Sequence, residues 1–183
     1  MSDTNEVTVV EVPAWVIRVA RLRVTVGFGV AVVAFWLARP SWCSLAVGAL
    51  VGSAGALLRL WAAGHLEKAV EVTTSGPYRW TRHPLYVGSL LLGVGFATAS
   101  RDPLTAALVV LYLVGSLTVA ARLEEETLRV KFGIAYDEYA RGAAPAISRP
   151  FSLARARRNG ELRALAGGAA ALAVLAIKAF WLW

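Results

Sequence analysis

Long apolar runs separated by short polar turns constrain the fold of this chain more than any other feature. The runs cover residues 16–38, 42–63, 84–99, 104–121 and 164–183. An α-helix needs roughly 20 such residues to cross the hydrocarbon core of a bilayer. The sequence therefore predicts an all-α integral membrane bundle of five transmembrane helices, with residues 1–183 forming one domain. The run at 84–99 is short, so we expect added length from the turn around His83, or a helix that ends in a protein-lined cavity.

The composition points to the same class of protein. Of the 183 residues, 57% are hydrophobic, and the mean hydropathy of +0.58 is too high for an ordinary soluble domain. The formal charge of +7 does not indicate nucleic-acid binding, because the basic residues are not gathered on one soluble face. Cys43 is the one cysteine, which excludes an internal disulfide and a cysteine-based metal site, and we expect no metal. Residues 1–13 are polar and acidic, unlike a cleaved signal peptide.

The basic residues also predict an orientation, because they favour the cytoplasmic side of a membrane protein. With the N-terminus in the cytoplasm, 15 of the 19 Lys and Arg residues fall on the cytoplasmic side. Arg39 and Arg101 fall in the outer turns. This orientation places the C-terminus on the opposite side of the membrane, which we expect to be a cell inner membrane. It also brings both long polar segments, 64–83 and 122–163, to the cytoplasmic face.

The connector between the second and third runs carries the densest polar chemistry. At about twenty residues it is long for a helix–helix link, which favours a functional role. It leads into GPYRWTRHPLYVG, residues 76–88, which contains Tyr78, His83 and Tyr86. Pro84 marks a helix start, so these polar groups stand at the mouth of a membrane helix. His83 can bind a ligand or only cap this helix, and the residues alone leave both explanations open.

The second polar segment, EEETLRVKFGIAYDEYARG, is predicted to continue the fourth run as a helix beyond the membrane. Its apolar and aromatic residues recur at three- and four-residue spacing, which predicts one helix face. These residues are Leu128, Phe132, Ala135, Tyr136 and Tyr139. Extending that face back one turn gives Glu124, a carboxylate at the membrane boundary that needs a cationic partner or ligand. Glu125 and Glu126 have local partners in Arg122 and Arg129.

The order of these elements strongly resembles the isoprenylcysteine carboxyl methyltransferases and the related bacterial and phospholipid methyltransferases. The resemblance rests on RHP-x-Y-x-G, two apolar spans, and an EE pair followed by FG-x-x-Y-x-x-Y, and it covers about residues 59–150. It implies that this region is the catalytic core of a small multi-helix membrane protein. It also implies that the protein binds S-adenosylmethionine near the cytoplasmic face and methylates a lipophilic substrate entering from the bilayer.

The resemblance, together with the chemistry that the cofactor and substrate need, predicts which residues form the site. The predicted cofactor-binding residues are Val72, Thr73, Tyr78, Arg82, His83, Pro84, Leu85, Tyr86, Gly95, Glu124, Glu125 and Tyr136. The predicted catalytic residues are Glu124, His83 and Arg122. A sulfonium cation suits an aromatic surface, while the charged amino-acid end of the cofactor suits a carboxylate and cationic or backbone donors. Methyl transfer needs chiefly alignment in a dry site. A carboxylate acceptor requires no general base, whereas an amine acceptor makes Glu124, Glu125 or His83 a candidate base.

Two departures from the isoprenylcysteine pattern concern the acceptor. Ala120 stands where an arginine that faces the substrate carboxylate is expected, and the V-P-R-x-I-P tail is reduced to residues 144–148. The expected acceptor is the carboxylate of an isoprenylcysteine-type lipid, which Arg122 could hold, with N-methylation of phospholipid ethanolamine as the alternative. A membrane sterol-type reductase and a non-catalytic membrane scaffold are the alternatives outside this chemistry. The oligomeric state is left open.

Some of these residues also have purely structural explanations. Gly93 and Gly95 suit close helix packing at least as well as cofactor contact. Tyr139 is expected to pack a cytoplasmic helix onto the bundle. The arginines at 155–158 are expected to meet anionic headgroups, which makes membrane lipids partners of this face.

Overall fold

The protein is helical throughout the residues that the computed structural model describes, 14–182. The elements are α1 (Ala14–Leu37), α2 (Trp42–His65), η1 (Gly76–Arg79), α3 (Pro84–Ser100), α4 (Pro103–Phe132), α5 (Ile134–Ala140), α6 (Leu153–Arg158) and α7 (Glu161–Leu182). No strand occurs among these residues, so the predicted all-α class is confirmed for them. The polar segment 1–13 lies outside the described residues.

Within residues 14–182, three helices are long and apolar enough to cross a membrane, namely α2, α4 and α7. Helix α3 is shorter, as the short third run predicted. The apolar part of α1, Leu22–Leu37, is also shorter, although residues 16–38 were predicted to form a full span. The 30 residues of α4 make a helix about 45 Å long, which exceeds a hydrocarbon core of about 30 Å. Its last turns are therefore available to form a site at the membrane surface.

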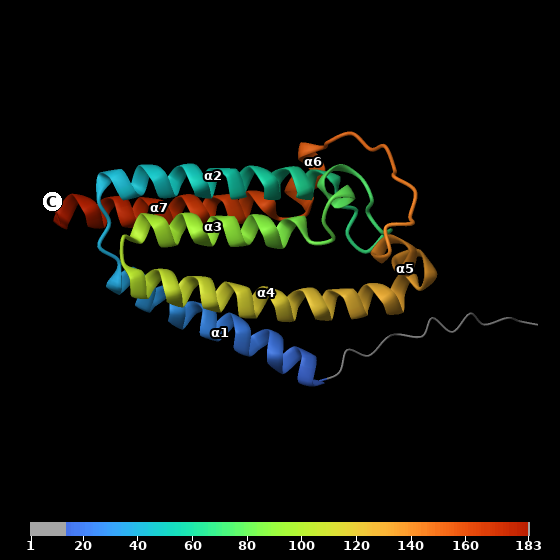
Figure 1. The fold of residues 1–183 in the computed structure, drawn as a ribbon, viewed down its shortest axis with the longest axis horizontal. Coiled ribbons are helices and arrows are strands. Elements are labelled where there is room, and N and C mark those ends of the chain that lie inside the picture. Colours follow the sequence, from blue (N-terminus) through green and yellow to red (C-terminus); the bar gives the residue numbers. More distant parts are fainter. Residues whose placement is uncertain (1–13, 183) are drawn as a thin grey trace, which may run out of the picture.

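Helices α2, α3, α4 and α7 run along a common axis, and α1 is tilted against α4 (Figure 1). Helix α2 packs extensively on α3, α7 lies against both, and α4 joins α3 to α1. The short helices α5 and α6 gather with the 66–83 connector at one end of the bundle (Figure 1). Segments far apart in the sequence therefore meet at that end.

Glycines bring α2 and α3 into close contact. A Cβ atom on Gly48 would lie 2.4 Å from the carbonyl oxygen of Gly95, and one on Gly55 would lie 2.7 Å from that of Gly88. A Cβ atom on Gly95 would meet the backbone nitrogen of Gly52 at 2.6 Å. Small residues allow such backbone approach in membrane helices. This contact fixes the register of α2 against α3 and hence the position of the N-terminus of α3.

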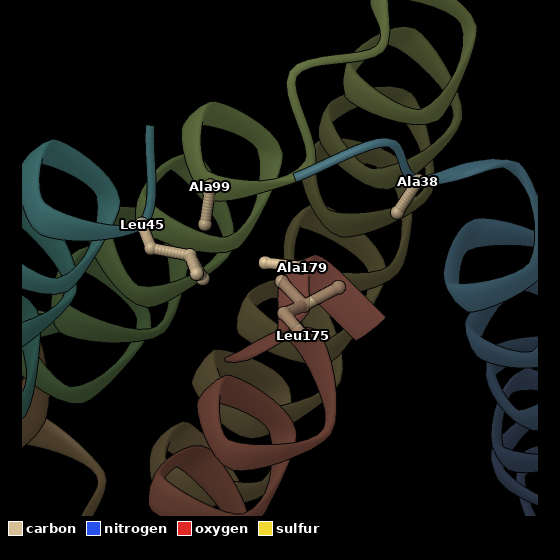
Figure 2. Packing of buried hydrophobic residues seen from close by; sticks show 5 residues of the cluster. All are labelled: Ala38, Leu45, Ala99, Leu175 and Ala179. Carbon is tan, nitrogen blue, oxygen red and sulfur yellow. The ribbon is translucent and has the colours of Figure 1, made fainter. Parts of the chain in front are cut away.

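A small apolar core fills the other end of the bundle (Figure 2). Its buried residues are Ala38, Leu45, Ala99, Leu175 and Ala179. Near it, the Lys178 ammonium donates hydrogen bonds of 2.7 Å to the carbonyl oxygens of Phe35 and Trp36. These are terminal carbonyls of α1, which lack partners within that helix. Lys178 thus ties α7 to α1.

The predicted continuous helix after the fourth run is interrupted at Gly133. The backbone there has a φ of +51°, a left-handed conformation that favours glycine, and α4 ends one residue earlier. The prediction of a single helix through Tyr139 is therefore wrong. The break starts α5 in a new direction (Figure 1), and the Tyr139 hydroxyl of α5 contacts the connector at the Tyr78 carbonyl oxygen.

Candidate functional site

A cavity of about 620 Å³ lies at the end of the bundle where the connector, α5 and α6 gather. This volume is in the range of small-molecule sites. The walls come from the C-terminal end of α2, the connector, the first turn of α3, the last turns of α4, helix α5 and the start of α7. Both polar segments singled out in the sequence therefore contribute to one enclosure.

A carboxylate of α4 holds His83 in the cavity wall. His83 is the N-cap residue of α3, but its side chain makes no capping hydrogen bond, so the explanation that it only caps the helix is wrong. Its Nε2 atom lies 2.9 Å from Oε1 of Glu125, and Nη1 of Arg82 lies 3.1 Å from the same oxygen. Glu125 thus pairs with the connector rather than with Arg122 or Arg129, and the predicted local pairing is wrong.

The neighbouring carboxylate lies near Tyr86. Glu124 lies close enough to the Tyr86 hydroxyl to interact with it electrostatically. The Tyr86 ring stacks on the His83 imidazole, with ring centroids 5.4 Å apart and an interplanar angle of 18°. Successive helical residues point about 100° apart, so Glu124 and Glu125 can reach different rings. Glu125 therefore orients the His83 ring, on which the Tyr86 ring stacks, and Glu124 itself lines the cavity.

Three tyrosines form another part of the wall. The Tyr139 hydroxyl donates a hydrogen bond of 2.9 Å to the carbonyl oxygen of Tyr78, which confirms a packing role for Tyr139. Burial raises the pKa of Tyr139 to about 12 and raises the pKa of Tyr78 further, so both stay protonated at neutral pH. Tyr136 is only 1% exposed, and its hydroxyl makes no hydrogen bond to the described residues. A buried hydroxyl without a partner in a cavity wall is suited to binding a ligand.

A segment after α5 covers the connector from the outside. We call this segment the strap, residues 143–152. The Thr74 hydroxyl donates to the carbonyl oxygen of Pro145 and accepts from the Ile147 N–H group, both at 3.0 Å. Arg79 donates to the Ile147 carbonyl oxygen at 3.3 Å. The reduced tail motif thus retains a structural role, because it holds the connector in place.

An ion pair between Arg155 of α6 and Glu67 of the connector, which we call the clamp, lies at the cavity rim. The Arg155 Nε atom lies 2.6 Å from Oε1 of Glu67, and this hydrogen bond is the main cause of the lowered pKa of the Glu67 carboxyl group. Arg155 also donates to the Gly64 carbonyl oxygen at the end of α2. The prediction that Arg155 meets lipid headgroups is therefore wrong, whereas Arg157 and Arg158 remain exposed.

One feature of the cavity was not predicted from the sequence. Arg59 of α2 and Glu161 of α7 form a two-point ion pair, with 2.7 Å between Nε and Oε1 and 2.9 Å between Nη2 and Oε2. Both residues line the cavity, and Asn159 lies beside them in its wall. Arg59 and Glu161 are 102 positions apart, and no local sequence pattern connects them.

The structure gathers most of the predicted site residues around the cavity. The residues that line it are Val72, Thr73, Tyr78, Arg82, His83, Pro84, Leu85, Tyr86, Glu124 and Tyr136. Glu125 contributes indirectly, through His83 and Arg82. Gly95 does not line the cavity, because it is packed against the α2 backbone. Arg122 is exposed and does not line the cavity either, so its predicted catalytic role lacks support from its position.

The donor set fits S-adenosylmethionine in chemical terms. Tyr78, Tyr86 and Tyr136 offer aromatic surface to a sulfonium cation, which cation–π attraction favours. Glu124 offers a carboxylate to an ammonium or ribose hydroxyl, and Arg82 offers a guanidinium to a carboxylate. The unpartnered Tyr136 hydroxyl supplies one more polar contact. The cavity therefore has a complement for each charged part of this cofactor.

Comparison with known proteins agrees with this assignment. The family model described as phospholipid methyltransferase matches residues 22–135, more than half of the chain. The nickel-cobalt-cadmium resistance protein NccN of Alcaligenes xylosoxydans xylosoxydans is 33% identical over 106 residues, in an alignment that covers 55% of this chain and 49% of that protein. The chain thus spans about half the length of this relative. No solved structure matches the chain significantly. The family match covers the paired connector and EE elements, and the chain belongs to the phospholipid methyltransferase family of membrane proteins.

Proposed function

We propose that this protein transfers a methyl group from S-adenosylmethionine to a lipid-borne acceptor in the cavity at the connector end of the bundle. The observation that carries the proposal is the arrangement of Glu124, Glu125, His83 and Tyr86. Glu125 orients the His83 ring, the Tyr86 ring stacks on His83, and both rings and Glu124 line a single cavity. A purely structural helix contact would not require an unpartnered hydroxyl and a cluster of tyrosines around an open volume.

Apart from accepting a proton from an amine substrate, the residues of the chain would bind and orient the reactants. Tyr86 and Tyr136 would stand near the sulfonium, Glu124 would accept from the cofactor's ammonium or ribose, and Arg82 would hold its carboxylate. Glu125 would keep the His83 ring in one orientation for a cofactor hydrogen bond. Bound cofactor supplies a methyl group whose bond to sulfur breaks, with its electron pair left on sulfur, as the acceptor lone pair forms the new bond. The contribution of the protein is alignment and exclusion of water.

The position of Arg122 favours an amine acceptor over a carboxylate. The isoprenylcysteine-type carboxylate requires an arginine that faces the substrate, but Ala120 stands at the expected position and Arg122 is exposed outside the cavity. An ammonium acceptor must instead lose a proton before its lone pair is free. Glu124 lines the cavity and can accept this proton, directly or through water. We therefore propose a phospholipid amine as the first candidate acceptor and the isoprenylcysteine-type carboxylate as the second.

The membrane topology is part of the proposal. Five crossings, with the N-terminus and the cavity on the cytoplasmic side of an inner membrane and the C-terminus on the other side, agree with the distribution of Lys and Arg. The connector end also exposes Trp80, which is 76% exposed, as interfacial aromatic residues often are. Trp80 would then lie at the level of the headgroups, where the acceptor enters.

Other activities have less support. The relative that carries a metal-resistance name does not define a metal site here, since residues 14–182 contain no group of three His, Cys, Asp or Glu side chains that could hold a metal ion. A reductase would oxidise a nicotinamide cofactor stereospecifically. A non-catalytic scaffold would bind neither a nicotinamide cofactor nor S-adenosylhomocysteine. Ligand binding therefore distinguishes a methyltransferase, a reductase and a scaffold.

The proposal is tested by methyl transfer in lipid nanodiscs. Purified protein is incubated with methyl-labelled S-adenosylmethionine and either phosphatidylethanolamine or an S-farnesyl carboxylate. Glu124→Gln is tested alongside, with Glu126→Gln as the control because Glu126 does not line the cavity. We expect label in the phosphatidylethanolamine, a loss of roughly a hundredfold in rate for Glu124→Gln, within the usual range for a general base, and no loss for the control. Label only in the farnesyl carboxylate would reverse the order of acceptors. Label in neither lipid would remove both candidate acceptors.

A further inference from the structure

The Arg59–Glu161 ion pair is an unusual component for a cavity wall at the end of a membrane bundle. We propose that this pair is the recognition site for the acceptor headgroup and that it selects a lipid whose headgroup carries one negative and one positive charge. The inference rests on the proposed function, since it assigns the specificity of the same cavity. Glu161 lies outside the family match at residues 22–135, so the pair is a property of this chain rather than of the matched region.

The pair is buried but accessible from the cavity. The side chains of Arg59 and Glu161 are 18% and 3% exposed, and both line the cavity. Arg59 is also anchored to α3, because Nη1 donates to the carbonyl oxygen of Leu85 and to the hydroxyl of Ser89. The Nε and Nη2 edge of the guanidinium is the edge that faces Glu161. Arg59 therefore stays in place if Glu161 exchanges its partner.

A two-charge headgroup can exchange with this pair without leaving a buried charge unpaired. Once Glu161 turns to another partner, the Nε and Nη2 edge of Arg59 can bind a phosphate through two parallel hydrogen bonds. The Glu161 carboxylate would then form an ion pair with the ammonium group of the same headgroup. A buried charge that loses its partner is strongly unfavourable, whereas exchange of one pair for two keeps each charge compensated. The pair thus favours a zwitterion on general electrostatic grounds.

A headgroup with a single charge is a poorer match. An anionic lipid would occupy Arg59 but leave Glu161 buried without a cation, and a cationic lipid would leave Arg59 without an anion. Selection by unpaired charge is a form of discrimination against the wrong ligand. The amino-acid end of the cofactor is also a zwitterion, so the test must distinguish it from the lipid.

The test compares lipid preference in variants that alter only the charges. The wild-type protein, Glu161→Gln, the double variant Arg59→Gln/Glu161→Gln and the control Arg155→Gln are each purified in detergent. Arg155→Gln also removes a buried ion-pair cation at this end, but Arg155 does not line the cavity. Each protein is given an equimolar mixture of phosphatidylethanolamine and phosphatidylmethanol, and retained lipids are counted by native mass spectrometry. Calorimetric affinity for S-adenosylhomocysteine is measured in parallel.

We expect the wild type and Arg155→Gln to retain phosphatidylethanolamine at least tenfold over phosphatidylmethanol. Glu161→Gln should invert this preference, because Arg59 then stands alone and matches an anion. The double variant avoids an unpaired buried charge, so it should fold, and it should show no preference. Affinity for S-adenosylhomocysteine should stay within about threefold in all four proteins.

Two results would overturn the inference. If Glu161→Gln and the double variant keep the wild-type lipid ratio, the pair is only a strut between α2, α3 and α7. If these variants lose affinity for S-adenosylhomocysteine while lipid preference is unchanged, the pair holds the cofactor instead. Failure of the proposed function gives a different pattern, in which the folded wild type itself neither binds S-adenosylhomocysteine nor transfers methyl groups.

Discussion

Replacement of Gly95 by alanine should destabilise the bundle without acting on the cavity. The new Cβ atom would lie 2.6 Å from the Gly52 nitrogen and 2.7 Å from the Gly48 carbonyl oxygen. Favourable contacts to carbon lie near 3.5–4.0 Å, so α2 and α3 would have to separate by about 1 Å. Overpacking costs about 1–3 kcal/mol, and the upper half of this range applies because both neighbours are backbone atoms. For a chain of this length, 2–3 kcal/mol corresponds to about 4–12 °C in Tm.

The assay is thermal unfolding in detergent, with Gly52→Ala as the matched control. A Cβ atom on Gly52 meets nothing nearer than Leu92 Cδ2 at 4.0 Å, and alanine is the better helix former by roughly 1 kcal/mol. Gly52→Ala should therefore keep or raise Tm while Gly95→Ala lowers it. If Gly95→Ala instead leaves Tm unchanged and weakens binding of S-adenosylhomocysteine, Gly95 contacts the cofactor and the packing explanation is refuted.

Three further changes test the site and its supports. Tyr136→Phe should weaken S-adenosylhomocysteine binding about threefold to tenfold and leave stability unchanged. Tyr139→Phe should lose about 1 kcal/mol of stability, because it loses the hydrogen bond to Tyr78. Equal effects of the two variants on binding would contradict a ligand role for Tyr136 and a packing role for Tyr139. Glu125→Gln should lower the cofactor affinity measured by calorimetry, because His83 loses the carboxylate that holds it, whereas Glu126→Gln should not. A normal affinity in Glu125→Gln would exclude a role for Glu125 in positioning His83. Arg155 lowers the pKa of Glu67 below its usual 4.5, so the clamp should persist above that pH and be lost as pH falls through the lowered value. Amide exchange in α6, corrected for intrinsic rates, should then accelerate below pH 4.5, and a flat profile would show that the clamp does not support α6.

The helices and the composition of the cavity could be predicted because both leave local signals in the sequence. Apolar runs of membrane length predict helices, and Pro84 and Pro103 stand at the first positions of α3 and α4. The connector and the EE pair were predicted to meet at one face, and in the structure His83 and Glu125 are in contact. Gly95 was misplaced because a glycine in a membrane helix suits packing and ligand approach equally well, and only the position of α2 decides between them.

The rest depended on contacts between distant residues. The stripe through Tyr139 has helical spacing, but the left-handed backbone at Gly133 breaks it, and a glycine alone does not reveal its φ angle. Arg155 was taken for a lipid contact because its neighbours are basic, yet Glu67, 88 positions away, binds it. Arg59 and Glu161 likewise come into contact only because α2 and α7 pack together. A single sequence contains no local pattern that predicts such an ion pair.

Calorimetric titration of the detergent-purified protein with S-adenosylhomocysteine tests the central claim most directly. The wild type should bind, and His83→Ala or Glu124→Gln should weaken binding at least tenfold, which corresponds to about 1.4 kcal/mol. The folded state of each variant is checked by its thermal unfolding profile. No binding by a folded wild type, or equal binding by all three proteins, would contradict the assignment of this cavity as a methyl-donor site.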